Sequence, residues 1–216
     1  MNVLELFAGS CTFSKEAQKL GHNTFSSDYR QFGNVDYVVD VFDFDISKVP
    51  FKPDLIWASP PCTSFSVAAL WRHWDKLTPI SDKAKYGVKM VQKTLDIINE
   101  FNPKYWYMEN PRGRLRSLDV VKDLPRTTIW YCKYGMTMAK PTDVWTNNLF
   151  DPMFNTSGWK PRPQCFNGNK DCHHEKTDRE AKKVKQMGIS QVSGNHNRSM
   201  LPKELCIEIL KQSKYD

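Results

Sequence analysis

The sequence predicts an α/β fold in which helices cover a mostly parallel sheet. Over the first two thirds of the chain, short apolar runs alternate with amphipathic stretches, as in strand–helix–strand units. The length of 216 residues, 40% of them hydrophobic, is enough for one full-sized domain with a buried core. Several apolar runs also end in turns that carry polar or reactive side chains, and open α/β sheets place their ligand crevice at such ends.

Six apolar runs are predicted as strands, and three stretches are predicted as helices. The strands are Val3–Phe7, Thr24–Ser27, Tyr37–Val41, Leu55–Ala58, Tyr105–Met108 and Thr128–Tyr131. The first helix has apolar residues at helical spacing and ends at Gly21: Phe13, Ala17 and Leu20. A longer helix ends before Pro103 and has its apolar face at Val88, Val91, Leu95, Ile98 and Phe101. A last helix is expected at Pro202–Leu210.

Two segments lack a sustained period. We expect Trp71–Lys85 to be a mobile loop, because it follows a turn that carries a cysteine. From about Lys133 the chain is rich in Pro, Asn, Gly, Cys and His. Such a stretch buries little apolar surface, so we expect a main domain over residues 1–132 and a small irregular segment over residues 133–216. Close docking or a metal ion would have to hold that segment in place.

Charge and composition indicate which classes of binding partner and which compartment to expect. The formal net charge of +7 favours a polyanion such as nucleic acid, although many basic proteins bind none. The sequence has neither a long apolar run nor a signal peptide pattern, so we expect a soluble protein of the cytoplasm, or of the host cytoplasm if it is viral, with no membrane partner. In that compartment the six cysteines indicate catalysis, metal binding and burial rather than disulfides.

A turn of small residues follows the first predicted strand. Gly9 in this turn lets a ligand approach the backbone, and the helix that follows offers free N–H groups. Asp28 follows the second strand, where nucleoside-binding folds place an acid on ribose hydroxyls, and Asp40 ends the third. From this pattern alone, a tight turn with two solvated acids is an equally good interpretation.

A cysteine and a glutamate follow two further strands. Two prolines fix the turn after Leu55–Ala58 and leave Cys62 at the carboxyl end of the sheet, as a candidate nucleophile. A free cysteine is more often a small buried hydrophobic residue. Glu109 follows Tyr105–Met108 and reaches the same edge, although alone it would be interpreted as a structural acid. Two reactive side chains at one edge favour a catalytic site.

Taken in this order, the three motifs resemble those of the DNA cytosine-5 methyltransferase family. The resemblance covers roughly residues 3–131 and implies a Rossmann-like S-adenosylmethionine-dependent methyltransferase fold. It implies that Cys62 is the nucleophile and that Glu109, with Asn110, is the acid motif. The implied cofactor residues are Phe7, Ala8, Gly9, Ser10, Asp28, Asp40 and Pro60. The chain departs from the family pattern at Ser10, Cys11 and Thr12, which replace glycines, and at Pro111, which replaces valine.

The chemistry of cytosine explains these residue types. C5 is a poor nucleophile, but addition of a thiolate at C6, with a proton delivered towards N3, gives an enamine whose C5 attacks a sulfonium methyl group. Cys62 and Glu109 suit these two roles, provided that positive charge favours the thiolate and that Glu109 is protonated. A base inside a duplex must be flipped out, and the loop Val67–Lys85 is suited to closing over it.

A second cluster consists of soft ligands: Cys132, Cys165, Cys172, His173 and His174. It indicates a zinc site, with scattered buried cysteines and surface histidines as the alternative. The stretch resembles a subset of phage and bacterial family members in which a Cys-x6-Cys-x-His pattern follows a Lys-Pro-Thr segment, here Lys140–Thr142. That match implies Cys132, Cys165, Cys172 and His174 as the ligands. We expect Cys11 and Cys206 to be packing residues.

The expected organisation is therefore an S-adenosylmethionine-binding catalytic domain over residues 1–132, with a zinc-stapled DNA-contacting segment and a C-terminal helix over residues 133–216. Two basic groups are candidates for phosphate contacts or simply solvated faces: Arg112, Arg114 and Arg116, and Lys176, Arg179, Lys182, Lys183 and Lys185. We expect a monomer that acts on DNA. Only about eighty residues follow the catalytic motifs, so a partner protein is one source of sequence specificity.

Three alternative functions stay open at this point. The first is an enzyme of the same fold that modifies a free cytosine nucleotide or another substrate that is not DNA. The second is transfer of an alkyl group other than methyl, because the motifs fix the cofactor class better than its substituent. The third is a DNA-binding protein without catalysis, and the presence of both Cys62 and Glu109 argues against it.

Overall fold

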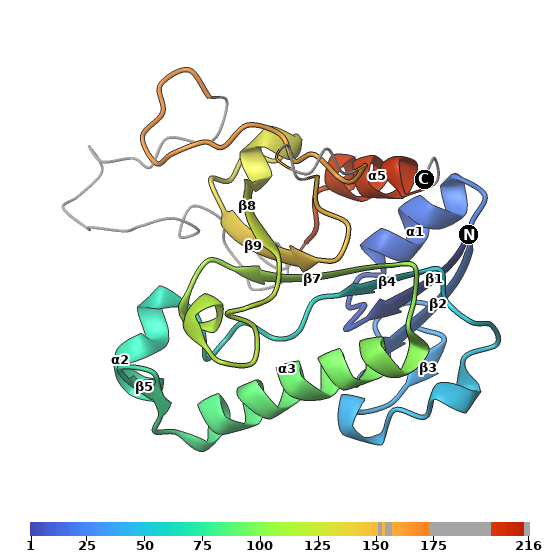
Figure 1. Cartoon of the computed structure of the whole chain (residues 1–216), viewed down its shortest axis with the longest axis horizontal. Coiled ribbons are helices and arrows are strands. Elements are labelled where there is room, and N and C mark those ends of the chain that lie inside the picture. The colour runs from blue at the N-terminus through green and yellow to red at the C-terminus, as the bar shows by residue number, and fades with distance from the viewer. Residues whose placement is uncertain (151–152, 154–156, 173–199, 214–216) are drawn as a thin grey trace.

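The computed structural model describes residues 1–150, 153, 157–172 and 200–213. Its centre is a seven-stranded sheet in the order β3-β2-β1-β4-β7-β9-β8 (Figure 1). The strands are β1 (Asn2–Leu6), β2 (Asn23–Asp28), β3 (Tyr37–Val38), β4 (Leu55–Ala58), β7 (Tyr105–Pro111), β8 (Arg126–Trp130) and β9 (Pro141–Thr146). β3, β2, β1, β4 and β7 are parallel, and β9 is antiparallel to both β7 and β8. This architecture confirms the predicted α/β class.

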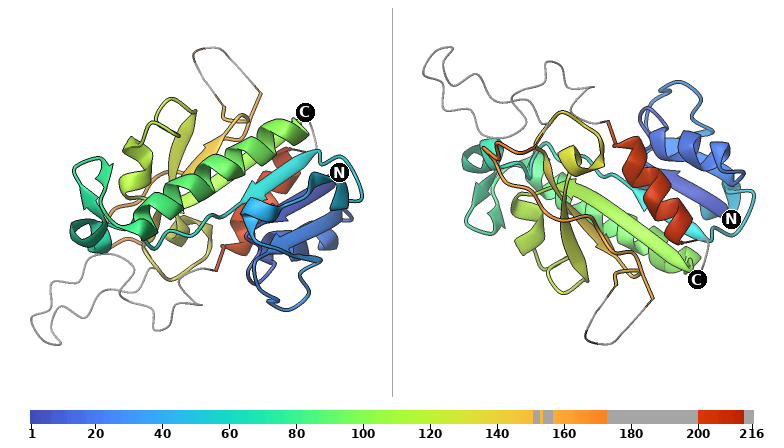
Figure 2. Two further views of the ribbon diagram at one scale, coloured as in Figure 1. Left: turned by 90° about the horizontal axis from the view of Figure 1, so that it is seen from below. Right: turned by 90° about the horizontal axis from the view of Figure 1, so that it is seen from above.

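Helices cover both faces of the sheet. α1 (Thr12–Lys19) and α5 (Lys203–Gln212) pack together on one face, and α3 (Asp82–Phe101) crosses the other (Figure 2). Alternate residues of each strand point to opposite faces. In β4, Ile56 belongs to the core under α3, whereas Leu55 and Trp57 belong to the core under α1 and α5. The central strands are therefore buried on both sides, and only their ends are free to bind a ligand.

The chain direction creates a crevice between β1 and β4. From β1 the chain runs outward to β2 and β3, and it then crosses over to β4 and β7 on the other side. The loops that follow β1 and β4 therefore diverge at the carboxyl edge of the sheet, and ligands of open α/β sheets bind at such a point. The candidate residues in the turns after β1 and β4, Asp28 at the end of β2 and Glu109 near the end of β7 all lie at this edge.

The predicted strands and helices are confirmed, with shifts at their ends. Two strand ends shift by three residues: β7 runs on to Pro111, and β3 stops at Val38, after which a 3-10 turn, η1 (Val41–Asp43), follows. The side chain of Asp40 caps this turn by accepting a hydrogen bond from the N–H of Phe42 at 3.1 Å. α3 begins six residues before its first predicted apolar position, because the Ser81 hydroxyl caps it by accepting from the Ala84 N–H at 3.2 Å.

Two expectations about irregular segments are wrong. The stretch Trp71–Lys85 contains regular structure: part of α2 (Leu70–His73), an antiparallel pair β5 (Trp74–Asp75) and β6 (Thr78–Pro79), and the start of α3. Short 3-10 turns also occur: η2 (Ile46–Lys48), η3 (Val67–Ala69), η4 (Arg114–Ser117) and η5 (Tyr131–Tyr134). Beyond residue 132, β9 is not irregular but is an interior strand of the main sheet.

β9 is buried although several of its residues are polar. Asp143 is fully buried, and its carboxylate accepts hydrogen bonds from Arg116, Arg126 and the Thr128 hydroxyl. These partners come from η4 and β8, so only tertiary contacts make this aspartate acceptable inside a sheet. Cys11 and Cys206 are buried, as predicted. Within the described part of the chain, no helix is long and apolar enough to cross a membrane.

Candidate active site

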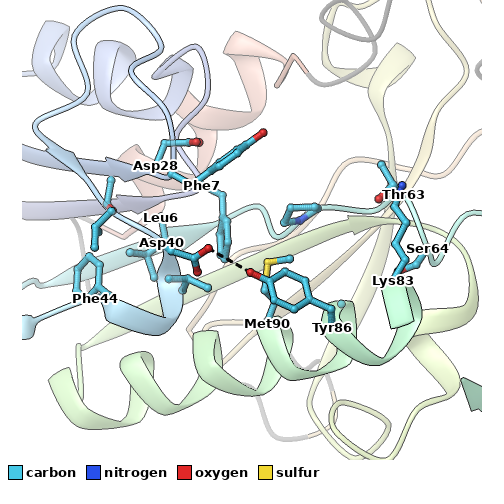
Figure 3. Close-up of a pocket in the computed structure, with 16 residues that line it drawn as sticks. Leu6, Phe7, Asp28, Asp40, Phe44, Thr63, Ser64, Lys83, Tyr86 and Met90 are labelled. Atoms are coloured by element: carbon cyan, nitrogen blue, oxygen red, sulfur yellow. Dashed lines mark hydrogen bonds between the residues drawn. The ribbon is translucent and has the colours of Figure 1, made fainter. Parts of the chain in front are cut away.

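A cavity of about 290 Å³ lies at the carboxyl edge of the sheet, between the strand ends and α3 (Figure 3). Residues from five parts of the chain line it: Leu6, Phe7, Ser27, Asp28, Tyr29, Val39, Asp40, Val41, Phe44, Pro61, Thr63, Ser64, Lys83, Tyr86, Gly87 and Met90. Most of the lining is apolar or aromatic, and two carboxylates face into it. Such a cavity suits a ligand with a flat ring and hydroxyl groups.

The turn after β1 shapes one wall of the cavity. Phe7 and Gly9 both have left-handed backbone angles, with φ of 57° and 50°. The Gly9 N–H donates a hydrogen bond to Asp28 Oδ2 at 2.9 Å, and the Arg30 N–H donates to Oδ1 at 3.3 Å. Burial raises the pKa of Asp28, and these backbone donors oppose that effect. The turn therefore holds the Asp28 carboxylate at the end of β2.

A second carboxylate is held from the opposite side. The Tyr86 hydroxyl, on α3, donates a hydrogen bond to Asp40 Oδ2 at 3.1 Å. Figure 3 shows this pair, with Phe7 and Asp28 to one side and Thr63, Ser64 and Lys83 farther along α3. Because Oδ1 of Asp40 caps η1, both oxygens have fixed positions. The cavity thus has two carboxylates held by hydrogen bonds, Asp28 at the end of β2 and Asp40 after β3.

The turn after β4 carries Cys62 between two residues that line the cavity. Pro61 and Thr63 face the cavity, and Cys62 is half-buried. The carbonyl of Cys62 accepts hydrogen bonds from the N–H groups of Phe65 and Ser66 at 3.0 and 3.2 Å. The thiol is therefore presented by a closed turn whose neighbours are part of the cavity wall.

Glu109 lies beside this turn because β4 and β7 are neighbours, with Ala58 paired to Met108. Its carboxyl group is buried, and the Tyr131 hydroxyl donates to Oε2 at 3.4 Å. The next residue, Asn110, donates from Nδ2 to the carbonyl of Pro60 at 2.8 Å. One hydrogen bond therefore joins the segment that carries the acid to the turn that carries the thiol.

The two reactive groups influence each other and share a cation. Burial raises the pKa of Cys62, the Lys140 ammonium opposes this, and Glu109 adds to it. Burial also raises the pKa of Glu109, while Lys140 and the hydroxyls of Ser59 and Tyr131 lower it. A raised carboxyl pKa favours the protonated form, so the site places a group that can donate a proton beside a thiol.

Comparison with known proteins identifies the family. The profile described as "C-5 cytosine-specific DNA methylase" matches residues 2–124, more than half of the chain. The chain belongs to the family of C-5 cytosine-specific DNA methylases. A viral protein named "Probable DNA (cytosine-5)-methyltransferase", from Frog virus 3 (isolate Goorha), is 31% identical over 156 residues, 68% of this chain and 71% of that protein. The family assignment makes the chain an S-adenosylmethionine-dependent methyltransferase that acts on cytosine C5 in DNA.

Two solved structures align with this chain. The Entamoeba histolytica methyltransferase EhMeth aligns with a TM-score of 0.52 at 13% identity, over 76% of this chain and 57% of that chain. The S. pombe Dnmt2 methyltransferase aligns with a TM-score of 0.47 at 14% identity, over 74% and 56%. The methyltransferase thus spans a little more than half the length of each of these structures. The first of these likenesses supports the Rossmann-like methyltransferase fold that the sequence predicts.

The predicted cofactor residues of the methyltransferase divide into two groups. Phe7, Asp28 and Asp40 line the cavity. The others do not line it but belong to the turns beside it: Ala8, Gly9, Ser10 and Pro60. Their N–H and carbonyl groups hold the framework, as in the bond from the Ala8 N–H to the Ser27 carbonyl at 3.0 Å.

Sequence reasoning missed the contribution of α3 and of Lys140. Lys83, Tyr86, Gly87 and Met90 line the cavity, and they recur at the three-to-four spacing of one helix face. That spacing is present in the sequence, but the expected loop at Trp71–Lys85 obscured the first turn of this helix. In the sequence, Lys140 stands out only as part of a Lys-Pro-Thr segment, and no local pattern places it beside Cys62.

Three of the predicted metal ligands lie together. The sulfur atoms of Cys132, Cys165 and Cys172 are all within 4.8 Å of one another, in a small buried cluster with Trp130 and Ala139. Tetrahedral zinc with Zn–S bonds of about 2.3 Å places its sulfur ligands about 3.8 Å apart, so the three thiols fit such an ion. His173, His174 and the basic residues from Lys176 to Lys185 lie outside the described residues.

One of the three arginines after the acid motif pairs with a buried carboxylate. Arg116 pairs with the buried carboxylate of Asp143. The guanidinium of Arg112 lies 5.7 Å from the centre of the Trp130 ring, and its side chain is exposed. Arg116 therefore has a structural role that its position in the sequence did not indicate, and Arg112 is better placed for a phosphate.

Proposed function

We propose that Cys62 and Glu109 carry out the methyl transfer of this family, through a covalent bond between the Cys62 sulfur and C6 of a cytosine in DNA. The observation that carries this proposal is that the two side chains lie together near the carboxyl ends of the paired strands β4 and β7. They lie next to a cavity whose apolar lining and two carboxylates suit a nucleoside. The hydrogen bond from Asn110 to Pro60 keeps the two segments in register. Both reacting groups come from the part of the chain that matches the family profile.

In the proposed reaction, the Cys62 thiolate adds to C6 while Glu109 gives its proton to N3. The electron pair of the C5–C6 double bond then becomes nucleophilic at C5. Bound S-adenosylmethionine would supply an electrophilic methyl group on a sulfonium, so that the bond from C5 to the methyl group forms as the bond from the methyl group to the sulfonium sulfur breaks and S-adenosylhomocysteine leaves. Loss of the C5 proton to a base and breakage of the bond between sulfur and C6 restore the thiolate, and the N3 proton returns to Glu109. Burial raises the pKa of the Glu109 carboxyl, which favours the protonated form before the addition.

The cofactor site is proposed to comprise the cavity and the turns that frame it. Asp28 and Asp40 offer fixed carboxylates to hydroxyl and amino groups, and Phe7, Phe44 and Met90 offer apolar contacts to a purine. Ala8, Gly9, Ser10 and Pro60 contribute through the backbone of the surrounding turns. A Cβ at Gly9 would meet no atom within 4 Å, so the approach to this turn is open.

A structural zinc ion is proposed at Cys132, Cys165, Cys172 and His174. The three thiols supply soft donors from two distant segments, and a tetrahedral ion would tie residues 165–172 to the end of β8. In this proposal residues 1–132, completed by β9 and α5, form the cofactor-binding catalytic part, and the zinc-stapled segment within residues 133–216 contacts DNA. The positive charge of the chain favours that contact through phosphates.

The activity is tested by incubating the purified protein with methyl-labelled S-adenosylmethionine and DNA of mixed sequence, followed by nucleoside analysis. We expect label in 5-methyldeoxycytidine only, and Cys62→Ser should abolish it while still binding S-adenosylmethionine. Parallel reactions with dCMP and with RNA test the alternative substrates. Label in dCMP or RNA but not in DNA would reject DNA as the substrate, and full activity of Cys62→Ser would reject the nucleophile.

A further inference from the structure

We propose that Lys140 is a positioning residue of the active site, whose charge stabilises the anion that resides first on Cys62 and then on Glu109. This inference rests on the proposed function. It concerns a residue outside the segment that matches the family profile, which ends at residue 124.

The backbone fixes where Lys140 lies. β8 and β9 are antiparallel and end at the pair Trp130 and Pro141, so the next residues, Tyr131 and Lys140, face each other across the strands. The Tyr131 N–H donates to the Lys140 carbonyl at 3.2 Å, which extends the pairing by one step. β9 also pairs with β7 next to Glu109. Lys140 thus directly precedes the strand that pairs with Glu109.

The side chain of Lys140 is directed inward. Only 3% of the residue is exposed, which is unusual for lysine. Its Nζ lies 4.5 Å from the centre of the Tyr131 ring, a cation–π contact, and the hydroxyl of the same tyrosine donates to Glu109. The ring therefore places the ammonium near the acid.

Among the residues that the structure describes, the charged and titratable groups that act on Cys62 or are acted on by it are Lys140, Glu109 and Tyr131. Lys140 is the cation among them, and it acts on both Cys62 and Glu109. A buried ammonium is costly unless anionic charge compensates it. A thiolate at Cys62 or a carboxylate at Glu109 provides that charge, so Lys140 and the reacting pair stabilise each other.

The proposed reaction moves one negative charge between these two groups. Before addition the charge is on the Cys62 sulfur and Glu109 holds a proton. When the bond between sulfur and C6 forms and the proton passes to N3, the thioether is neutral and Glu109 becomes a carboxylate. A fixed cation within reach of both groups stabilises the start and the end of this step without having to move. The reverse transfer at the end of the cycle benefits equally.

The test measures the Cys62 thiol in the free protein, without DNA or cofactor. The rate of carbamidomethylation by iodoacetamide is followed from pH 6 to 10, and mass spectrometry of the Cys62 peptide separates it from the other cysteines. Lys140→Met keeps the length of the side chain and removes the charge, and Lys140→Arg keeps the charge. Lys211→Met removes an exposed lysine on α5 as the matched control.

We expect Lys140→Met to move the alkylation profile of Cys62 to higher pH and to slow alkylation at pH 8 about tenfold, which corresponds to about one pKa unit. Lys140→Arg should restore most of the rate, and Lys211→Met should match the wild type. An unchanged alkylation profile in Lys140→Met would overturn the inference. If Lys140→Met does not fold, Lys140→Gln takes its place with the same expectation.

This experiment is independent of the proposed activity. If Cys62→Ser still methylates DNA, the mechanism fails whatever Lys140 does. If Cys62→Ser is inactive and the Cys62 profile does not depend on Lys140, only the role of Lys140 fails. An equal loss of alkylation in Lys140→Arg and Lys140→Met would mean that the lysine matters for its shape and not for its charge, and this result would also overturn the inference.

Discussion

The side chain of Asn110 donates a hydrogen bond from Nδ2 to the carbonyl of Pro60 at 2.8 Å, and thereby joins the segment of Glu109 to the turn of Cys62. Asn110 is fully buried near the end of β7. This bond sets the separation of Glu109 and Cys62, because Asn110 directly follows Glu109 and Pro60 lies two residues before Cys62.

Asn110→Ala should therefore slow methyl transfer more than it weakens cofactor binding. A displacement of about 1 Å at the reacting groups costs on the order of a hundredfold in rate, so we expect a loss of about ten- to a hundredfold in kcat. The affinity for S-adenosylmethionine should stay near that of the wild type, because Asn110 does not line the cavity. Single-turnover assays and calorimetric titration measure the two quantities, with the exposed Asn23→Ala as control. Equal kcat in Asn110→Ala and wild type would contradict this view.

Glu109→Gln keeps the shape of the side chain and removes the transferable proton. Turnover should fall by about a hundredfold or more, the contribution typical of general acid catalysis. Burial raises the pKa of Glu109, so the protonated form persists above the ordinary range of a carboxyl group, and wild-type turnover should decline as pH rises through that pKa. The Cys62 thiol must lose its proton before it can add to C6, so turnover should first rise with pH. The two effects together give a bell-shaped pH profile. Single-turnover rates against pH test this, and a descending limb that persists in Glu109→Gln would assign it to another group.

Glu5 predicts a pH-dependent stability that is separate from catalysis. Its carboxylate accepts the N–H groups of Phe13 and Ser14 at 3.3 and 2.8 Å, but burial raises its pKa to about 7. Between its ordinary pKa and about 7, unfolding releases a proton, so stability falls as pH rises through this window and then levels off. The full shift corresponds to about 3 kcal/mol.

Urea unfolding at pH 5 and pH 8 measures this effect. The wild type should lose up to about 3 kcal/mol more between the two pH values than Glu5→Gln, because the variant lacks the titrating group. Glu100→Gln, an exposed position on α3, should behave as the wild type does. Identical pH dependence in Glu5→Gln and wild type would show that Glu5 is ionised in the folded protein across this range.

The sequence predicts those parts of the fold and site that depend on local pattern. The strands β1, β2, β4 and β7, and the reactive residues that follow β4 and β7, are found because apolar runs and turn residues are local signals. β9 was missed because Asp143 looks unsuited to a buried strand until Arg116 and Arg126 reach it from elsewhere in the chain. Lys140 was missed for the same physical reason, since its partners are brought together by strand pairing.

Zinc removal should loosen the segment that carries the thiols. The protein purified without chelator should contain about one zinc ion per chain, and removal should weaken DNA binding more than binding of S-adenosylmethionine, because none of the three described thiols lines the cofactor cavity. Cys165→Ser and His174→Ala should both lose the metal, and His173→Ala should keep it. Elemental analysis decides the matter: less than about half an equivalent, or full retention in His174→Ala, would reject the site or its fourth ligand.

The central claim is that Cys62 bonds covalently to C6 of the target base. DNA that contains 5-fluorocytosine should trap the wild-type protein, because the fluorine at C5 prevents the final elimination after methyl transfer. With S-adenosylmethionine present, we expect a denaturation-resistant complex whose proteolysis and mass spectrometry give one modified peptide that contains Cys62. Cys62→Ser should give no such complex. A trapped complex joined through another residue, or active turnover of ordinary DNA without any trapping by the fluorinated DNA, would contradict the claim.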